Sequence, residues 1–196
     1  MKDIHDILRI KTNNINPARG KILISEPFLY DFFFKRSVVL LAEHNEEGTF
    51  GVIVNKPIRA KFNDVIKDFP KFSSRIYLGG PVQNDNLFFV HTLGDQIEGS
   101  SEILPGLHWG GDVERVKDLI SLKILGPDDI RFYIGYSGWA PKQLEAELER
   151  NSWAVSSIEV EKLLSTKPSD LWNLSLKVLG EDYLRWSNFA DDPSLN

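Results

Sequence analysis

Two apolar runs joined by a short polar turn constrain the fold of this chain more than any other feature. Residues 37–42 (Ser-Val-Val-Leu-Leu-Ala) and 49–54 (Thr-Phe-Gly-Val-Ile-Val) have the length of strands and are rich in β-branched side chains. Residues 45–48 (Asn-Glu-Glu-Gly) between them have the composition of a hairpin loop. The pattern predicts a buried β-hairpin, and the remaining elements must pack against the sheet that it begins.

Other segments add strands and helices to this hairpin. Apolar runs predict strands over 20–25, 75–78, 87–93 and 130–136, with a short one near 107–109. Helical spacing predicts helices over 3–10, 62–69, 158–165 and 169–179, and two more that begin near Asp112 and Pro141. Strands dominate the first half, and helices mix with strands in the second. This order favours a single α+β domain with a mixed, largely antiparallel sheet and flanking helices.

Length and composition set the expected domain organisation. The chain has 196 residues and no linker-like segment, so one domain is expected. We expect an N-terminal extension over 1–19, a compact domain over 20–190 and a frayed tail over 191–196. The N-terminus lacks the apolar region of a signal peptide, and no run approaches the roughly 20 apolar residues of a membrane helix. These features predict a cytoplasmic protein with no membrane association.

Composition excludes several kinds of chemistry. The sequence has no cysteine, which excludes disulfides, iron–sulfur clusters, cysteine zinc sites and thiol nucleophiles. A formal net charge of −5 repels phosphate backbones, and no nucleic-acid-binding motif is present, so nucleic acid is not an expected partner. His44, His91 and His108 lack the spacing of metal ligands on a helix. We therefore expect neither a metal nor another cofactor.

The segment Gly135-Tyr136-Ser137-Gly138 matches a nucleophile elbow only in part. That motif needs glycine two residues after the serine, where Trp139 stands, and its histidine follows the serine, whereas all four histidines here precede Ser137. We interpret the segment as a tight strand-to-helix turn and assign no catalytic residue. The glycine pairs 79–80 and 110–111 match no phosphate-binding fingerprint and predict tight turns.

A series of ordered motifs extends over nearly the whole chain. They are residues 20–24 (GKILI) with Pro27, Phe33 with 36–41 (RSVVLL), Glu43-His44, 51–57 (GVIVNKP), 79–82 (GGPV), His91, and 135–145 (GYSGWAPKQLE) followed by Glu147 and Trp153. With these motifs the chain resembles the AlgH/YqgE family of small bacterial proteins. The resemblance implies a cytoplasmic bacterial protein with a compact α/β-type fold and no established activity. The family is often labelled as transcriptional regulators.

Polar and turn-forming members of these motifs are the candidate site residues. They stand at predicted strand ends, where packing alone does not require histidine, asparagine or glutamine and where binding sites are commonly built. We expect them to converge on one ligand-binding groove. They are Arg36, His44, Asn55, Gly79, Gly80, Tyr136, Trp139, Gln143 and Glu147, with Arg36 and Glu147 near the rim.

Three functions remain open. The preferred one is a non-enzymatic binding or regulatory protein whose groove holds a small ligand or a protein partner, because no catalytic constellation is complete. The second, which rests on the family label, is a DNA-linked transcriptional regulator, and it predicts salt-dependent affinity for DNA. The third is an unrecognised hydrolase that uses His44 as a base with Glu43 or Glu147.

Overall fold

One long strand, β8 (Ile130–Trp139), organises the molecule, because both halves of the sheet pair with it. In the computed structural model, which describes residues 13–29 and 31–189, the beginning of β8 pairs with β5 (Val82–His91) and β4 (Ile76–Leu78). Its end, residues 137–139, pairs with β3 (Gly48–Ile53). The predicted helix over 3–10 and the tail over 191–196 lie outside the described residues.

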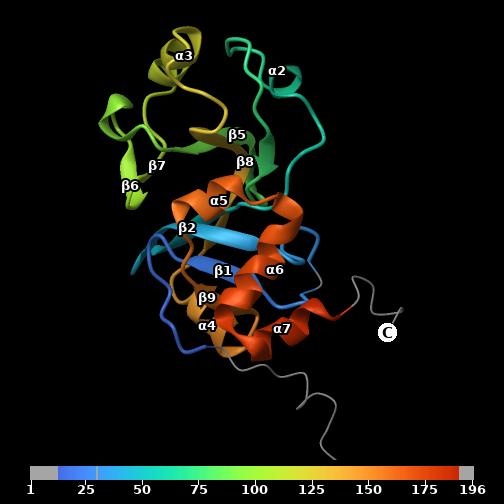
Figure 1. Ribbon diagram of the computed structural model, residues 1–196. Helices are drawn as coiled ribbons and strands as arrows, with labels where there is room; N and C mark the ends of the chain where they lie inside the picture. Colours follow the sequence, from blue (N-terminus) through green and yellow to red (C-terminus); the bar gives the residue numbers. More distant parts are fainter. Residues whose placement is uncertain (1–12, 30, 190–196) are drawn as a thin grey trace, which may run out of the picture.

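The sheet extends from β8 in two directions (Figure 1). Beyond β3 it continues through β2 (Val38–Asn45) and β1 (Ile22–Ser25) to β9 (Trp153–Ser156). Beyond β5 it continues through β7 (Leu107–Trp109) to β6 (Ser101–Leu104). We call these the first and second half-sheets. Among the described strands only β4 and β8 pair in parallel, so the predicted α+β fold with a mixed, largely antiparallel sheet is confirmed.

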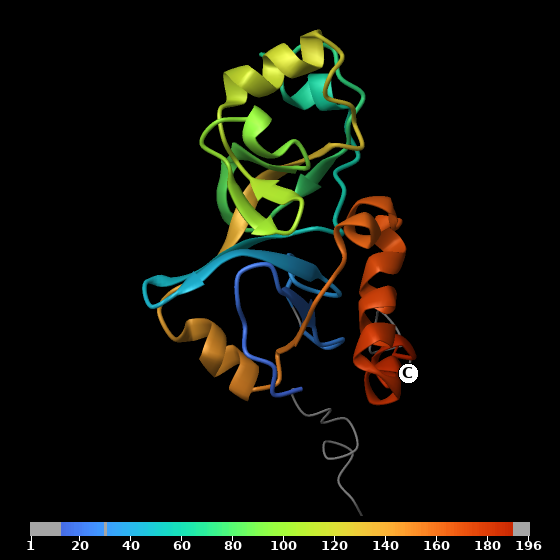
Figure 2. The ribbon, with the colours of Figure 1, turned by 60° about the vertical axis from the view of Figure 1, so that its left-hand side comes forward.

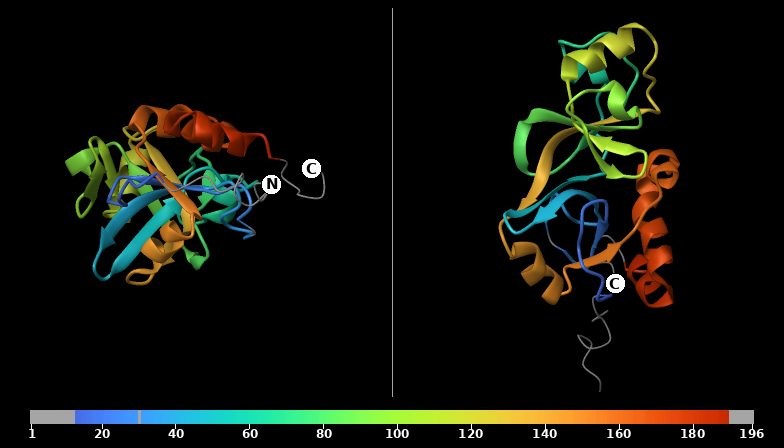
Figure 3. Two further views of the ribbon diagram at one scale, coloured as in Figure 1. Left: turned by 90° about the horizontal axis from the view of Figure 1, so that it is seen from below. Right: turned by 90° about the vertical axis from the view of Figure 1, so that its left-hand side faces the viewer.

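Helices cover both faces of the first half-sheet. Helix α4 (Gln143–Glu149) lies on one face, and α5 (Val160–Ser165), α6 (Pro168–Leu179) and α7 (Glu181–Ser187) lie on the other, as Figures 2 and 3 show. The second half-sheet packs against α2 (Phe62–Val65) and α3 (Val113–Ser121), and a 3-10 turn, η1 (Gly94–Gln96), follows β5. Asp112 caps α3 as predicted, because its Oδ1 accepts a hydrogen bond from Glu114 N at 2.9 Å.

Strand β2 is buried on both faces, which explains its unbroken apolar run. Val38 and Leu40 face α6, whereas Val39 and Leu41 face α4. A bulge between Leu41 and Glu43 then shifts the register of β2 against β3. The strands stay paired beyond the bulge, but each later side chain of β2 points to the other face of the sheet than it would without it. As a result Glu43 lies beside Phe50 on the α6 face, and His44 lies beside Thr49 on the α4 face.

Several predicted boundaries are wrong, for local reasons. The helix expected over 62–69 is a single turn, because the Asn63 side chain binds the backbone of Phe69, Pro70 and Phe72 and holds that segment in a loop. Strands β6 and β9 and helix α7 were not predicted, since each is too short for its periodicity to be recognised.

The motif around Ser137 is also different from its prediction. Residues 135–138 belong to β8 and do not form a strand-to-helix turn. The Ser137 side chain is fully buried, and its Oγ donates to the Gly79 carbonyl at 3.0 Å. Ser137 therefore serves the packing of the sheet.

The predicted N-terminal extension contacts the domain through Asn13. The Asn13 side chain donates to the Val155 carbonyl and accepts a hydrogen bond from Val155 N. These bonds cover part of the exposed edge of β9. The division into extension, domain and tail stays a prediction.

Candidate functional site

The nine predicted site residues lie in three places. Where α4 meets the first half-sheet lie Trp139, Gln143, Glu147 and His44. Where the two half-sheets meet lie Gly79, Gly80 and Tyr136. The opposite end of the β2–β3 hairpin holds Arg36 and Asn55. The expectation that all nine share one groove is therefore wrong. Binding of a ligand by individual members stays a prediction.

Glu147 accepts three hydrogen bonds, two of which join α4 to the sheet. Its Oε2 accepts from the indole nitrogens of Trp139, at 2.9 Å, and Trp153, at 2.7 Å. Its Oε1 accepts from Gln143 Nε2 at 3.0 Å, and Gln143 Oε1 in turn accepts from Ala140 N at 3.0 Å. Both tryptophans are buried, so the carboxylate satisfies donors that have no access to water. The most distinctive part of the sequence motif therefore holds the fold together.

His44 is bound to a hydroxyl group. Its Nδ1 lies 2.6 Å from Thr49 Oγ1, and its Nε2 lies 3.8 Å from Glu145 Oε1. Glu147 is held by the tryptophans, and Glu43 accepts a hydrogen bond from Asn45 Nδ2 at 3.0 Å. The carboxylate beside His44 is thus Glu145, and neither Glu43 nor Glu147 is placed to orient a His44 base.

Arg36 and Asn55 close the far end of the hairpin. Asn55 Oδ1 accepts from Val38 N, and its Nδ2 donates to the Arg36 carbonyl, each at 2.9 Å. The Arg36 guanidinium lies 5.0 Å from the Trp172 ring and donates to the Phe189 carbonyl. These contacts tie the start of β2 to α6 and the C-terminal segment.

Gly79 and Gly80 allow the chain to pass closely along β8. A Cβ on Gly79 would lie 2.1 Å from the Gly135 oxygen, and one on Gly80 would lie 2.3 Å from the Tyr136 carbonyl carbon. The Gly79 carbonyl accepts hydrogen bonds from both Ile53 N and Ser137 Oγ. The glycine pair therefore joins the two half-sheets and leaves no space for a ligand against its own backbone.

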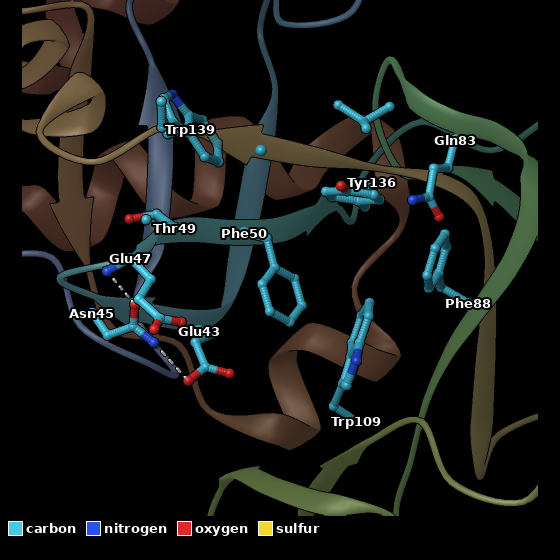
Figure 4. Close-up of a pocket in the computed structure, with 14 residues that line it drawn as sticks. Glu43, Asn45, Glu47, Thr49, Phe50, Gln83, Phe88, Trp109, Tyr136 and Trp139 are labelled. Carbon is cyan, nitrogen blue, oxygen red and sulfur yellow. Dashed lines mark hydrogen bonds between the residues drawn. The ribbon is translucent and has the colours of Figure 1, made fainter.

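A pocket of about 710 Å³ lies on the α6 face of the sheet, where the half-sheets meet. Four half-buried rings line it: Phe50 from β3, Phe88 from β5, Trp109 from β7 and Tyr136 from β8 (Figure 4). Each ring touches two others. The centroid separations are 5.6 Å for Phe50–Trp109, 5.8 Å for Trp109–Phe88, 5.5 Å for Phe88–Tyr136 and 6.1 Å for Tyr136–Phe50. The strands thus build an aromatic wall that faces an open cavity.

The charged residues that line this pocket are both acidic. Glu43 and Glu47 come from the hairpin, and Asn45 bridges them: its Nδ2 donates to Glu43 Oε1, and its Oδ1 accepts from Glu47 N at 2.8 Å. Glu43 is the cross-strand neighbour of Phe50. The pocket therefore combines aromatic faces with negative charge, and none of the described residues that line it is a lysine, arginine or histidine.

Gly138 keeps the pocket open. It lies in β8 directly opposite Phe50, it is exposed, and its φ is not in the left-handed region that favours glycine. A Cβ there would lie 3.1 Å from Tyr136 Cε2 and 3.8 Å from Val82 Cγ2. Since glycine weakens a strand unless something must approach closely, its presence here indicates a need for space beside the rings.

Of the predicted residues, Tyr136 and Trp139 line this pocket. Sequence reasoning missed Phe50, Phe88, Trp109 and Gly138, because they come from four strands whose pairing is not visible in the sequence. Gly138 lies inside the most distinctive motif, but it was interpreted as part of a tight turn, and only the structure places it within a strand.

His91 and His108 stack with ring centroids 5.5 Å apart. His91 Nε2 lies 3.1 Å from the Gly110 carbonyl, and Nδ1 accepts from Leu93 N at 3.3 Å, so the neutral ring satisfies both contacts. Burial lowers the pKa of His91, the Gly110 bond opposes this, and His108 lowers it further. In the described part of the chain no three histidine or acidic side chains gather as metal ligands would.

Among residues 13–29 and 31–189, no helix has both the length and the apolar character needed to cross a bilayer. The expected cytoplasmic location stays a prediction.

Comparisons with known proteins agree on one family. A family model described as AlgH-like matches residues 22–184. A "UPF0301 protein" from Bacteroides thetaiotaomicron is 45% identical over 192 residues, 97% of each chain, and another from Chlorobaculum tepidum is 39% identical over 90% of this chain and 95% of its own.

Solved structures support the same assignment. The solution structure of the AlgH protein from Pseudomonas aeruginosa matches with a TM-score of 0.70 and 28% identity, over 91% of this chain and 98% of that one. A crystal structure of a Corynebacterium diphtheriae protein, 23% identical, shares the fold with a TM-score of 0.74 over 96% of this chain and all of that one. Because the family model spans most of the chain and close relatives span nearly all of it, the chain belongs to the AlgH-like, UPF0301 family.

Proposed function

We propose that this chain is a non-enzymatic binding protein whose aromatic pocket takes a ligand that carries a positively charged nitrogen. The observation that carries the proposal is the set of four contacting rings, with Glu43 and Glu47 beside them and no cationic side chain among the described residues of the lining.

The chemistry of the pocket favours a cation over an anion or a neutral molecule. A cation within about 6 Å of an aromatic centroid is attracted by the ring quadrupole, and the gain is about 0.5–2 kcal/mol. Glu43 and Glu47 add Coulombic attraction on one side of the pocket. The same two carboxylates repel phosphate, so a nucleotide or a DNA backbone fits poorly.

The geometry supports the two other candidate functions less well. A DNA-linked regulator needs a basic face, but the chain has a formal net charge of −5 and the charged residues described in the lining of the aromatic pocket are acidic. A hydrolase that uses His44 as a base with Glu43 or Glu147 needs one of these carboxylates beside the histidine, but Glu43 is bound to Asn45 and Glu147 to the two tryptophans.

The test compares choline with 3,3-dimethylbutan-1-ol, which has the same shape and no charge. We expect choline to quench tryptophan fluorescence with a Kd on the order of millimolar, and the neutral isostere to bind about threefold to thirtyfold more weakly. Equal affinity of the two, or binding of neither, would contradict the proposal.

Charge variants locate the site. Glu43→Gln and Glu47→Gln should each weaken choline binding by about twofold to fivefold, because each removes an exposed or half-exposed carboxylate. Glu46→Gln is the matched control, since Glu46 lies in the same turn but does not line the pocket. A loss of binding in Glu46→Gln as large as in the other two would mean that only the general field of the hairpin attracts the cation.

A further inference from the structure

A second cavity has the opposite charge. It has a volume of about 380 Å³ and lies between the segment joining α5 to α6 and the loops that lead into β4 and β8. In the part of the chain that the structure describes, its charged lining residues are three cations, Arg75, Arg131 and Lys167, and one carboxylate, Asp128. This local positive charge is opposite in sign to the formal net charge of the chain, which is −5.

Arg131 is the central observation. Its side chain comes from β8, and the residue is 8% exposed. Its Nη2 donates to the Leu164 carbonyl at 2.6 Å, and its guanidinium lies 5.1 Å from the Tyr77 ring. Neither group carries a full negative charge, and among the described residues no carboxylate forms an ion pair with Arg131.

A buried guanidinium without an anionic partner is costly, because its charge has left water without compensation. Arg131 has five N–H donors; the Leu164 carbonyl accepts from the Nη2 group, and the Tyr133 hydroxyl also lies against the guanidinium, so donors remain for a ligand. The cavity lies directly against it and is also lined by hydroxyl groups, among them Ser165 and Thr166. Guanidinium, ammonium and hydroxyl donors around one space suit the several acceptor oxygens of a phosphate group.

We propose that this cavity binds a phosphate group, free or as a phosphate monoester, with Arg131 as the buried anchor and Arg75 and Lys167 at the mouth. The site is separate from the aromatic pocket and does not depend on the function proposed for it. Arg75 and Lys167 are exposed, so they add long-range attraction and their removal leaves the core intact.

The test titrates the full chain with inorganic phosphate and with glycerol phosphate, against sodium chloride of equal ionic strength, and follows backbone amides by NMR. We expect saturable shifts centred on residues 164–167 and 73–75, with a Kd on the order of millimolar. Tighter binding of glycerol phosphate supports a monoester ligand, and equal binding supports the free ion. Shifts that chloride reproduces, or no saturation up to about 50 mM phosphate, would overturn the proposal.

Variants separate binding from folding. The double variant Arg75→Ala/Lys167→Ala should weaken phosphate binding by about threefold to twentyfold while keeping the melting temperature. Lys177→Ala, an exposed cation near the other end of α6, is the matched control and should change nothing. Arg131→Gln should abolish measurable binding, and its folding is checked by circular dichroism. Unchanged affinity in the double variant would place the bound phosphate elsewhere and refute the site.

Discussion

Replacing Glu147 by alanine tests whether the most distinctive motif of this family serves stability. The substitution removes the acceptor of three hydrogen bonds, two of which come from the buried indoles of Trp139 and Trp153. Each buried donor left without a partner costs about 1–3 kcal/mol, so the two indoles together cost about 2–6 kcal/mol. For a domain of this size, each kcal/mol of lost stability lowers the melting temperature by about 2–4 °C. A central value of about 4 kcal/mol therefore lowers Tm by roughly 8–16 °C.

The assay is thermal and urea unfolding followed by tryptophan fluorescence, since Trp139 and Trp153 themselves report on the change. Glu149→Ala is the control: Glu149 is exposed on the same helix, and its removal should stay within about 0.5 kcal/mol. The destabilisation of Glu147→Gln should fall between those of the two alanine variants, at about 1–2 kcal/mol, because its amide replaces one of the two accepting oxygens by a donor.

The folded Glu147→Gln protein should also bind choline with unchanged affinity, because Glu147 lies on the opposite face of the sheet from the aromatic rings. A Glu147→Ala protein as stable as the Glu149→Ala control would refute the structural role. Normal stability together with lost ligand binding would instead return Glu147 to a binding site.

Three further predictions follow from the same geometry. Gly79→Ala should cost more than about 4 kcal/mol or prevent folding, because its Cβ would lie 2.1 Å from the Gly135 oxygen. In Gly106→Ala no described residue beyond its chain neighbours lies within 4 Å of the added Cβ, so the cost should be only the roughly 1–2 kcal/mol of a left-handed backbone. Equal losses of the two variants in denaturant titration would contradict the close contact at Gly79. Burial lowers the pKa of His91, so as the pH falls the unfolded chain takes up a proton before the folded protein does. The contribution of His91 to stability is therefore present above about pH 6.5 and is lost as the pH falls through the lower folded-state pKa. His91→Gln should flatten the change in the urea midpoint between about pH 8 and pH 5. His44→Ala should lower Tm, because the Thr49 hydroxyl loses its partner, and should leave choline binding intact. Loss of binding or of a measured turnover without loss of stability would favour the hydrolase function.

Local pattern was sufficient to predict the hairpin and much of the core. The β2–β3 pair follows from two apolar runs and a glycine-containing turn, and the Asp112 cap follows from residue type and position alone. Gln143 and Glu147 are four residues apart, which is the spacing of neighbours on a helix face, and a hydrogen bond joins them on α4.

The site could not be predicted in the same way, because it depends on long-range pairing. Phe50, Phe88, Trp109 and Tyr136 are brought together only when β3, β5, β7 and β8 pair. The bulge after Leu41 also turns Glu43 to the aromatic face and His44 away from it, and a single inserted residue of this kind leaves no mark in the composition. Polar motif residues such as Asn55 and Glu147 resembled site residues because buried backbone and indole donors also need polar partners.

The most direct test of the aromatic pocket is a nuclear Overhauser measurement between the methyl protons of bound choline and the protein's ring protons, in the native chain and in Gly138→Val. Binding in this pocket predicts contacts to Phe50, Phe88, Trp109 and Tyr136 in the native chain. It also predicts their loss in the folded Gly138→Val protein, whose added side chain occupies the space beside Tyr136. Contacts that persist in Gly138→Val, or that fall on rings outside this set, would contradict it.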